Sequence, residues 1–162
     1  MFDAVINHKS TLSGIGTGGS VADITAKTWP AVPYGPNDFH QSCEIKNYSD
    51  AYQVRNCWLQ GLADLNQGTE YVREKIAEYM NHCIDFGVTG FRVDAVKHMW
   101  PGDLENIYGR LKNLNTRHGF AANSRPFIAQ DVIDLDSEGI SRDDYVHLGT
   151  FIEFRFSATV SL

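Results

Sequence analysis

The segment GFRVDAVKH, Gly90–His98, begins like a buried strand and ends in charged residues. Phe91 and Val93 suit the interior of a pleated sheet, and they alternate with polar side chains. Four ionisable residues follow within the same segment: Arg92, Asp94, Lys97 and His98. Ionised groups are seldom buried unless they are paired or used. The segment therefore predicts a strand whose carboxyl end carries a functional site.

The sequence on both sides of this strand alternates between strand and helix patterns. A strand is predicted over residues 1–8, and a helix runs from an N-cap at Thr69 to Gly87. A second helix starts at Pro101, and further strands are predicted in 126–135 and 149–156. Strands that alternate with helices in this way form parallel sheets with right-handed crossovers.

Polar residues lie late in the first three predicted strands. They are Asn7 and His8, then Asp94, Lys97 and His98, then Asp131 and Asp134. Eight-stranded α/β barrels build their active sites at the carboxyl ends of several strands, whereas a nucleotide-binding fold needs a glycine-rich turn after its first strand. Four strands are too few to close a barrel. We therefore predict part of a (β/α)8 barrel, a TIM barrel, with the remaining strands missing.

A long irregular region separates the first strand from the first helix. Residues 10–65 are rich in Gly, Ser, Thr, Asn, Pro and Asp. A loop of this length is uncommon in a compact domain unless it forms a small insertion or carries function. Its GTGGS motif lacks the lysine and the following helix of a phosphate-binding loop, which argues against nucleotide binding.

Composition excludes several classes of function. A hydrophobic content of 43% with 21% charged residues is ordinary for a globular protein. The net charge of −6 argues against nucleic acid as a partner. No apolar run approaches the roughly 20 residues that span a bilayer, so no membrane partner is expected.

Three cysteines allow one disulfide. Cys43 and Cys57 lie in a polar, turn-rich stretch, where a disulfide would close a short loop. Three reduced structural thiols remain an equal alternative on the count alone. Cys83 lies on the apolar side of the first predicted helix and is expected to be a buried free thiol.

Asp94 and Asp131 come from consecutive strands, so their carboxyls can face each other. Two carboxyls about 5–5.5 Å apart suit a retaining glycosidase, although structural ion pairs or a metal site are the alternatives. Arg92 points to the same side of its strand as Asp94 and could keep it ionised or bind an anion. Asn7 and Asp64 offer hard oxygen ligands suited to calcium, but such residues also form turns and caps.

Three segments resemble the first three signature segments of animal alpha-amylases, in the same order. They are DAVINH at Asp3–His8, GFRVDAVKH at Gly90–His98 and FIAQDVID at Phe127–Asp134. The resemblance continues through NYSDAYQVRNC and HMWPGDL, is closest to insect sequences and covers essentially the whole chain. It implies a (β/α)8 barrel with strand 3 in 1–8, an irregular domain B in 9–66, and a continuation to about strand 6 in 67–162, with the remainder of the barrel missing.

The resemblance also implies a role for individual residues. Asp94 matches the catalytic nucleophile, and Asp131 occupies the position of the general acid, where the family has glutamate. Arg92 matches a chloride ligand, and Asp3 a structural carboxylate. Substrate contacts are implied for His8, Tyr48, Lys97 and His98. Calcium ligands are implied for the side chains of Asn7 and Asp64 and the backbone carbonyls of Arg55 and His98. A disulfide is implied between Cys43 and Cys57.

The function implied by the resemblance is retaining endo-hydrolysis of α-1,4-glucosidic bonds in starch, glycogen and maltooligosaccharides. Calcium and chloride are the expected cofactors, and a secreted, extracellular, digestive monomer is expected. The third catalytic carboxylate would lie beyond Leu162, so the chain alone is expected to be inactive. The alternative is a catalytically impaired relative that binds carbohydrate or a protein partner, and the aspartate at position 131 favours it.

Overall fold

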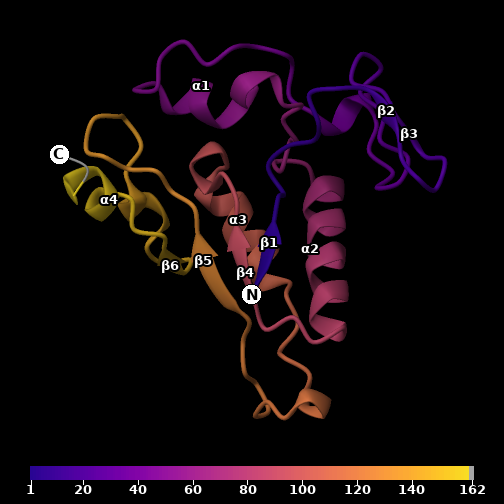
Figure 1. Cartoon of the computed structure of the whole chain (residues 1–162), viewed down its shortest axis with the longest axis vertical. Helices are drawn as coiled ribbons and strands as arrows, with labels where there is room; N and C mark the ends of the chain where they lie inside the picture. The colour runs from indigo at the N-terminus through magenta and orange to yellow at the C-terminus, as the bar shows by residue number, and fades with distance from the viewer. Residues whose placement is uncertain (161–162) are drawn as a thin grey trace.

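A four-stranded parallel sheet forms the centre of the computed structural model, which describes residues 1–160. The strands lie in the order β1 (Phe2–Ala4), β4 (Gly90–Val93), β5 (Phe127–Gln130) and β6 (Thr150–Phe151). Their carboxyl ends all point toward helix α1 (Ala51–Asn56), which lies across that end of the sheet (Figure 1).

Gly90 permits the close pairing of β4 and β5. A Cβ atom at this position would lie 2.8 Å from the carbonyl oxygen of Phe127. Any larger residue would therefore separate the two strands that carry Asp94 and Asp131.

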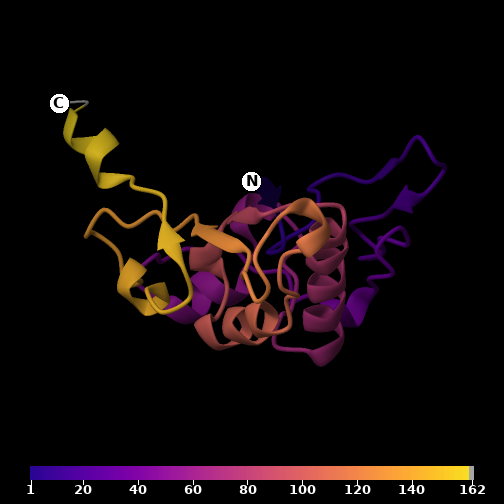
Figure 2. The same ribbon diagram turned by 90° about the horizontal axis from the view of Figure 1, so that it is seen from below.

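Two helices cover one face of the sheet and enclose the core. Helices α2 (Glu70–Asp85) and α3 (Pro101–Gly109) pack side by side on this face (Figure 2). The buried side of α2 consists of Val72, Ile76, Ala77, Met80 and Ile84. Because these residues recur at helical spacing, the amphipathic pattern explains the position of the helix. Burial of this stripe holds α2 against the sheet, in the connection between β1 and β4.

The segment between β1 and α2 has little regular structure. It contains an antiparallel pair, β2 (Gly14–Ile15) and β3 (Val21–Ala22), then η1 (Pro36–Asp38), α1 and η2 (Leu59–Gly61). A disulfide joins Cys43 to Cys57, with the two Cα atoms 4.8 Å apart, which confirms the predicted pairing. The disulfide brackets α1 and closes this part of the segment into a short loop.

The remaining elements are short and lie mainly in the connections that follow the strands. They are η3 (Val96–His98), η4 (Thr116–His118), η5 (Arg142–Tyr145) and α4 (Arg155–Val160). In the described residues, 1–160, no helix is long and apolar enough to cross a membrane.

The structure differs from the sequence predictions at several element ends. The first strand ends at Ala4, because the chain then turns away and His8 pairs with Asp64 instead. The predicted fourth strand ends at Phe151, and α4 begins at Arg155, whose backbone N–H is accepted by the Glu153 carboxylate at 2.6 Å. Cys83 is free as predicted but only partly buried.

Candidate active site

Three carboxylates surround one guanidinium at the carboxyl end of the sheet. Arg92 Nη1 lies 2.6 Å from Asp3 Oδ1 and 3.0 Å from Asp94 Oδ1. Arg92 Nη2 lies 2.7 Å from Asp131 Oδ2. Arg92 and Asp94 are two residues apart and therefore share one side of β4. The structure thus brings together the predicted nucleophile, the predicted acid and the predicted anion ligand.

A left-handed turn at Ala95 sets the direction of the chain after Asp94. Ala95 has φ 52° and ψ 36°, a conformation that costs an alanine energy. The turn lets η3 start at once, and the Val96 N–H donates to the Asp131 carbonyl at 3.0 Å. This turn therefore brings the segments that contain Asp94, Lys97 and Asp131 close together.

The carboxyl of Asp131 is nearly buried. Its side chain is 11% exposed, and its Oδ1 atom is buried without a hydrogen-bond partner. Burial raises the pKa of Asp131, the Arg92 guanidinium opposes that rise, and the negative charge of Asp94 adds to it. A raised carboxyl pKa beside a second carboxylate is the pattern expected of a proton donor and its partner.

A cavity of about 390 Å³ opens beside these carboxyls. Five residues predicted from the sequence line it: Tyr48, Asp94, Lys97, His98 and Asp131. Glu138 and Ile133 also line it, and the sequence analysis did not identify either. The cavity is bounded by β4, β5 and the segment that contains α1, so it spans the parts of the chain predicted to hold substrate.

Lys97 is one of the side chains that line this cavity. Its Nζ atom donates to the Ile133 carbonyl at 2.8 Å, pairs with the Glu138 carboxylate and lies 5.8 Å from the centre of the Tyr48 ring. Burial lowers the pKa of Lys97. Lys97 thereby links η3 to the loop after β5.

Two neutral imidazoles lie near Asp94. Nδ1 of His98 is 2.9 Å from the Val54 carbonyl, so it carries the proton and leaves Nε2 as an acceptor. Burial lowers the pKa of His98 to about 4. The contact with the Val54 carbonyl raises this pKa by a smaller amount, and the charge of Lys97 lowers it. Burial also lowers the pKa of His8, against a raising effect from Asp94. Both rings can therefore form hydrogen bonds without adding charge at neutral pH, and His98 does so as an acceptor at Nε2.

The residues predicted to hold calcium fit such an ion in their chemistry. Asn7 and Asp64 are fully buried, and Asn7 Nδ2 donates to Asp64 Oδ1 at 3.1 Å. The Asn7 Oδ1 atom is buried without a partner, and unpartnered buried oxygens are rare. Over residues 1–160, no backbone N–H donates to the carbonyls of Arg55 or His98. Hard oxygen atoms are the ligands that calcium prefers.

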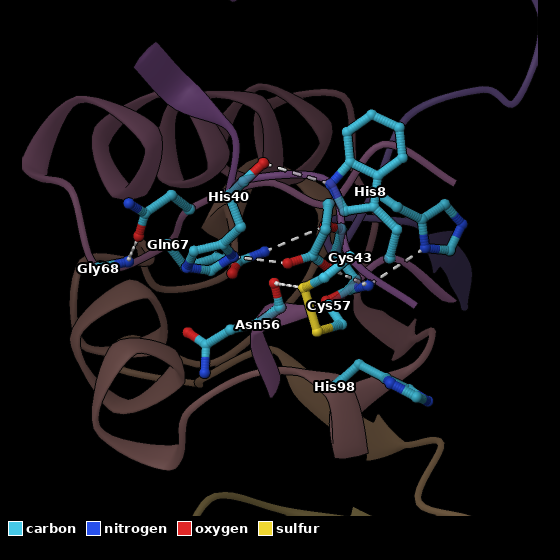
Figure 3. A network of polar contacts seen from close by, with 12 residues as sticks. His8, His40, Cys43, Asn56, Cys57, Gln67, Gly68 and His98 are labelled. Carbon is cyan, nitrogen blue, oxygen red and sulfur yellow. Dashed lines mark hydrogen bonds and ion pairs between the residues drawn. A yellow bond between two sulfur atoms is a disulfide. The ribbon is translucent and has the colours of Figure 1, made fainter. Parts of the chain in front are cut away.

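His40, which the sequence analysis missed, holds the second oxygen of Asp64. Its Nδ1 atom lies 2.6 Å from Asp64 Oδ2, and Figure 3 shows His40, His8 and the disulfide in the same polar network. Burial raises the pKa of Asp64 to about 6, and His40 and Asn7 oppose the rise. No group of three or more His, Cys, Asp or Glu side chains in the described part of the chain could hold a metal. Asp64 is therefore the one carboxylate in the calcium hypothesis, and the other proposed ligands are one amide oxygen and two backbone carbonyls.

The surroundings of Arg92 do not fit a chloride ion. Both terminal nitrogens of its guanidinium already contact carboxylates. One positive and three negative side chains leave an excess of negative charge, which repels a further anion.

Tyr145 connects three segments around the site, and the sequence analysis missed it. Its hydroxyl lies 3.0 Å from Arg55 Nε, 2.9 Å from the Met99 carbonyl and 3.2 Å from the Lys97 carbonyl. Arg55 also pairs with Asp144 at 2.8 Å. No local pattern predicts contacts between residues this far apart in sequence.

A larger hollow of about 550 Å³ adjoins the first cavity. The two share Tyr48 and Gln60, and the hollow is also lined by Glu44 and Trp58. It contains none of the predicted catalytic groups. We therefore place the candidate chemistry in the smaller cavity.

Comparisons with known proteins agree with this geometry. The sequence model of the family "Alpha amylase, catalytic domain" matches residues 1–130. The chain belongs to the alpha-amylase family. The family and its solved structures have a TIM-barrel-type fold, to which the parallel sheet corresponds.

Curated relatives of this chain include the alpha-amylases of Tribolium castaneum and Tenebrio molitor. Identity is 61% with the alpha-amylase of Tribolium castaneum and 58% with that of Tenebrio molitor, over 98% of this chain in both cases. An alpha-amylase-related protein of Drosophila lini is 52% identical. The chain spans about a third of the length of these relatives, 32%, 34% and 33% respectively.

Among solved structures, wild-type alpha-amylase I from Eisenia fetida is similar. Its TM-score is 0.91 at 45% identity, over 96% of this chain and 33% of that protein. A mutant of the same enzyme, solved in complex with maltohexaose, matches equally well.

Proposed function

We propose that the chain serves in a retaining alpha-amylase that cleaves internal α-1,4-glucosidic bonds of starch and glycogen. The observation that carries this proposal is the pair of carboxyls, Asp94 and Asp131, held on one guanidinium at the wall of a cavity. The family membership supports the same chemistry.

In this proposal Asp94 is the nucleophile. Its carboxylate attacks the anomeric carbon, and the bond to the leaving glucosyl oxygen breaks as Asp131 gives that oxygen a proton. Asp131 then takes a proton from water, which hydrolyses the glycosyl ester and restores Asp94. Arg92 holds Asp94 in place, because its Nη1 atom lies 3.0 Å from Asp94 Oδ1.

In this proposal the substrate binds to side chains in and near the same cavity. We assign contacts with the glucan to His8, Tyr48, Lys97 and His98. Tyr48 is partly exposed and offers a ring face for a sugar, while the two neutral imidazoles offer hydrogen bonds to hydroxyl groups. The maltohexaose bound to the related Eisenia fetida enzyme supports a maltooligosaccharide as ligand.

The details of the barrel are part of the proposal. We assign β1, β4, β5 and β6 to barrel strands 3 to 6, residues 9–66 to domain B, and residues 67–162 to the continuation of the barrel. The order of the parallel sheet and the irregular segment between β1 and α2 support this assignment.

We assign a calcium ion to the side chains of Asn7 and Asp64 and the carbonyls of Arg55 and His98. The unpartnered Asn7 oxygen supports the assignment. A bound calcium ion would tie the domain B segment to the sheet. The family also implies chloride, but the residues around Arg92 do not fit it, and no step here uses it.

Secretion of the protein is also proposed. The Cys43–Cys57 disulfide supports an oxidising, extracellular location, because disulfides seldom persist in the cytosol.

The test of the nucleophile is Asp94→Asn in the full-length protein. We expect hydrolysis of starch to fall by at least about four orders of magnitude with an unchanged melting temperature, because an amide of equal shape cannot form the glycosyl ester. Asp143→Asn, at an exposed position in η5, is the control and should retain activity. Reducing-sugar release by the Asp94 variant near the parent rate would remove Asp94 from this role.

A non-catalytic glucan-binding protein is the second candidate function. The observation that favours it is the short Asp131 side chain, whose carboxylate is bound to Arg92 and only 11% exposed. Maltohexaose binding by calorimetry without any turnover in the parent protein would favour this candidate over the enzyme.

A further inference from the structure

We propose that the Asp131 carboxylate is itself the anion of Arg92, so that this protein binds no halide at the position where its family takes chloride. The inference concerns the resting protein, in which Asp131 is ionised against Arg92; in the proposed hydrolysis Asp131 takes up a proton before it donates one to the leaving oxygen. It goes beyond that hydrolysis, because it concerns the occupant of the guanidinium. It rests on contacts, charge and side-chain length.

The contacts leave little of the guanidinium free. An arginine offers five N–H donors, of which the two terminal nitrogens carry four. Nη1 contacts Asp3 and Asp94, and Nη2 contacts Asp131 at 2.7 Å, a distance typical of a charge-assisted hydrogen bond. One N–H of Nη2 and the Nε–H are left, so a further anion would have to share the guanidinium with three carboxylates.

The local charge disfavours such an exchange. Among residues 1–160, Arg92 is the only cation that lowers the pKa of Asp131, whereas Asp94 and Asp3 raise it. Lys97, the other buried cation of the cavity, is already bound to Glu138 and the Ile133 carbonyl. A halide at Arg92 would meet three carboxylates and one positive charge.

The length of the side chain explains why Asp131 takes this position. Backbone hydrogen bonds hold residue 131 at both ends: its N–H donates to Val93 at 2.9 Å and its carbonyl accepts from Val96 at 3.0 Å. With the backbone fixed, the single methylene of aspartate brings the carboxylate to Arg92. A glutamate has one methylene more, so its carboxylate extends beyond the position that aspartate reaches.

The first measurement is chloride binding to the full-length protein by ³⁵Cl line broadening at neutral pH. We expect no saturable broadening in the parent up to about 100 mM chloride, at ionic strength held constant with sodium gluconate. Saturable broadening in the parent that is absent from an Arg92→Gln variant would overturn the proposal directly.

The second measurement uses Asp131→Ala, which removes the internal anion. This variant should gain saturable chloride binding and a melting temperature that rises with chloride or formate. The reason is that Nη2 loses its carboxylate partner while Asp3 and Asp94 stay on Nη1, so either anion can take the vacated contact. Asp143→Ala, which removes an equal charge from the exposed η5 turn, should gain neither. Identical behaviour of the Asp131 and Asp143 variants would contradict the proposal.

Asp131→Asn repeats the test if the alanine variant does not fold, because it keeps the shape and removes the charge. The parent measurement decides the question if neither variant folds. Neither readout requires turnover, so an inactive parent would count against the proposed hydrolysis and leave the halide result intact.

Discussion

The Tyr145 hydroxyl contacts the Arg55 side chain and two backbone carbonyls, those of Lys97 and Met99. The residue has no exposed surface, and it lies 90 positions from Arg55 and 46 from Met99. Arg55 packs its guanidinium on the Trp100 ring, 4.9 Å from the ring centre, and on the Tyr145 ring at 5.5 Å. Because the carbonyls of Arg55 and His98 lie beside these contacts, Tyr145 positions two of the proposed calcium ligands.

Replacement of Tyr145 by phenylalanine should destabilise the protein by about 1–3 kcal/mol, since Arg55 Nε loses a buried partner while the ring remains. The melting temperature measures this loss. The variant should need a higher calcium concentration than the parent to reach its highest melting temperature. Tyr52→Phe is the matched control, because Tyr52 is 68% exposed. Equal melting temperatures for the two variants would contradict the role given to the Tyr145 hydroxyl.

At the residue scale, sequence patterns located the side chains on strand ends but not their partners. Asp94, Lys97 and His98 follow a clear strand pattern, and the structure places them around one cavity. His40 and Glu138 lie in irregular segments without periodicity, so no pattern could identify them. Their contacts depend on how distant loops meet, which local propensity does not encode.

The loop between β5 and β6 is held in shape by one carboxylate. Asp134 accepts hydrogen bonds from the backbone N–H groups of Asp136 and Arg142, both at 3.0 Å, and from the Ser141 hydroxyl at 3.2 Å. Burial alone would raise the pKa of Asp134, but these bonds and Arg155 outweigh it and lower the pKa to about 2. The loop therefore presents Glu138 and Gly139 to the segment around α1.

Gly139→Ala should push this loop away from Ser49. A Cβ at position 139 would collide with the Ser49 carbonyl, and the Gly139 N–H donates to the Tyr48 carbonyl at 3.3 Å. We expect a loss of about 1–3 kcal/mol in stability and a higher KM for maltooligosaccharides, since Tyr48 and Glu138 line the cavity. Thermal melts and steady-state kinetics check this.

Gly109→Ala is the control for that substitution. Gly109 ends α3, and a Cβ added there would have no atom within 4 Å. Alanine also favours helices, so the stability of this variant should stay the same or rise. A Gly139 variant that behaves like the Gly109 variant would show that the loop tolerates the displacement.

At the element scale, long amphipathic helices were predictable and short elements were not. The N-cap at Thr69 and the start at Pro101 agree with α2 and α3. Leu111 and Leu114 continue the spacing of α3 and are buried, but they lie beyond its end at Gly109. The sequence of residues 154–156 is typical of a strand. However, α4 begins at Arg155, because the β6 pairing ends at Phe151.

At the scale of the whole molecule, long-range hydrogen bonds attach the segment between β1 and α2 to the connections that follow β4 and β5. They include the bonds of Arg55 to Tyr145 and of His98 to the Val54 carbonyl. The Asn7–Asp64 contact closes the segment on itself, in the proposed calcium region. The resemblance predicted the order of the sheet and an insertion in this place. It could not predict the path of the insertion, which follows tertiary contacts and one disulfide more than local patterns.

Calcium should stabilise the full-length protein. A ligand that binds only the folded state at 100 times its Kd adds about 2.7 kcal/mol, so chelation should lower the melting temperature and expose the α1 segment to protease. Magnesium at equal concentration should protect less, because it needs a tighter octahedral shell. Asp64→Asn should lose most of the calcium response. Chelation without any effect on the parent would exclude the site.

The Arg92 cluster also bears on the order in which the chain acquires its structure. Arg92 and Asp3 are 89 positions apart, Arg55 and Tyr145 are 90 apart, and Asn7 and Asp64 are 57 apart. Closing loops of this length costs entropy before any contact compensates for it, whereas helices such as α2 form from neighbouring residues. We therefore expect the candidate cavity to be among the last parts of the molecule to assemble during folding, after the helices have formed.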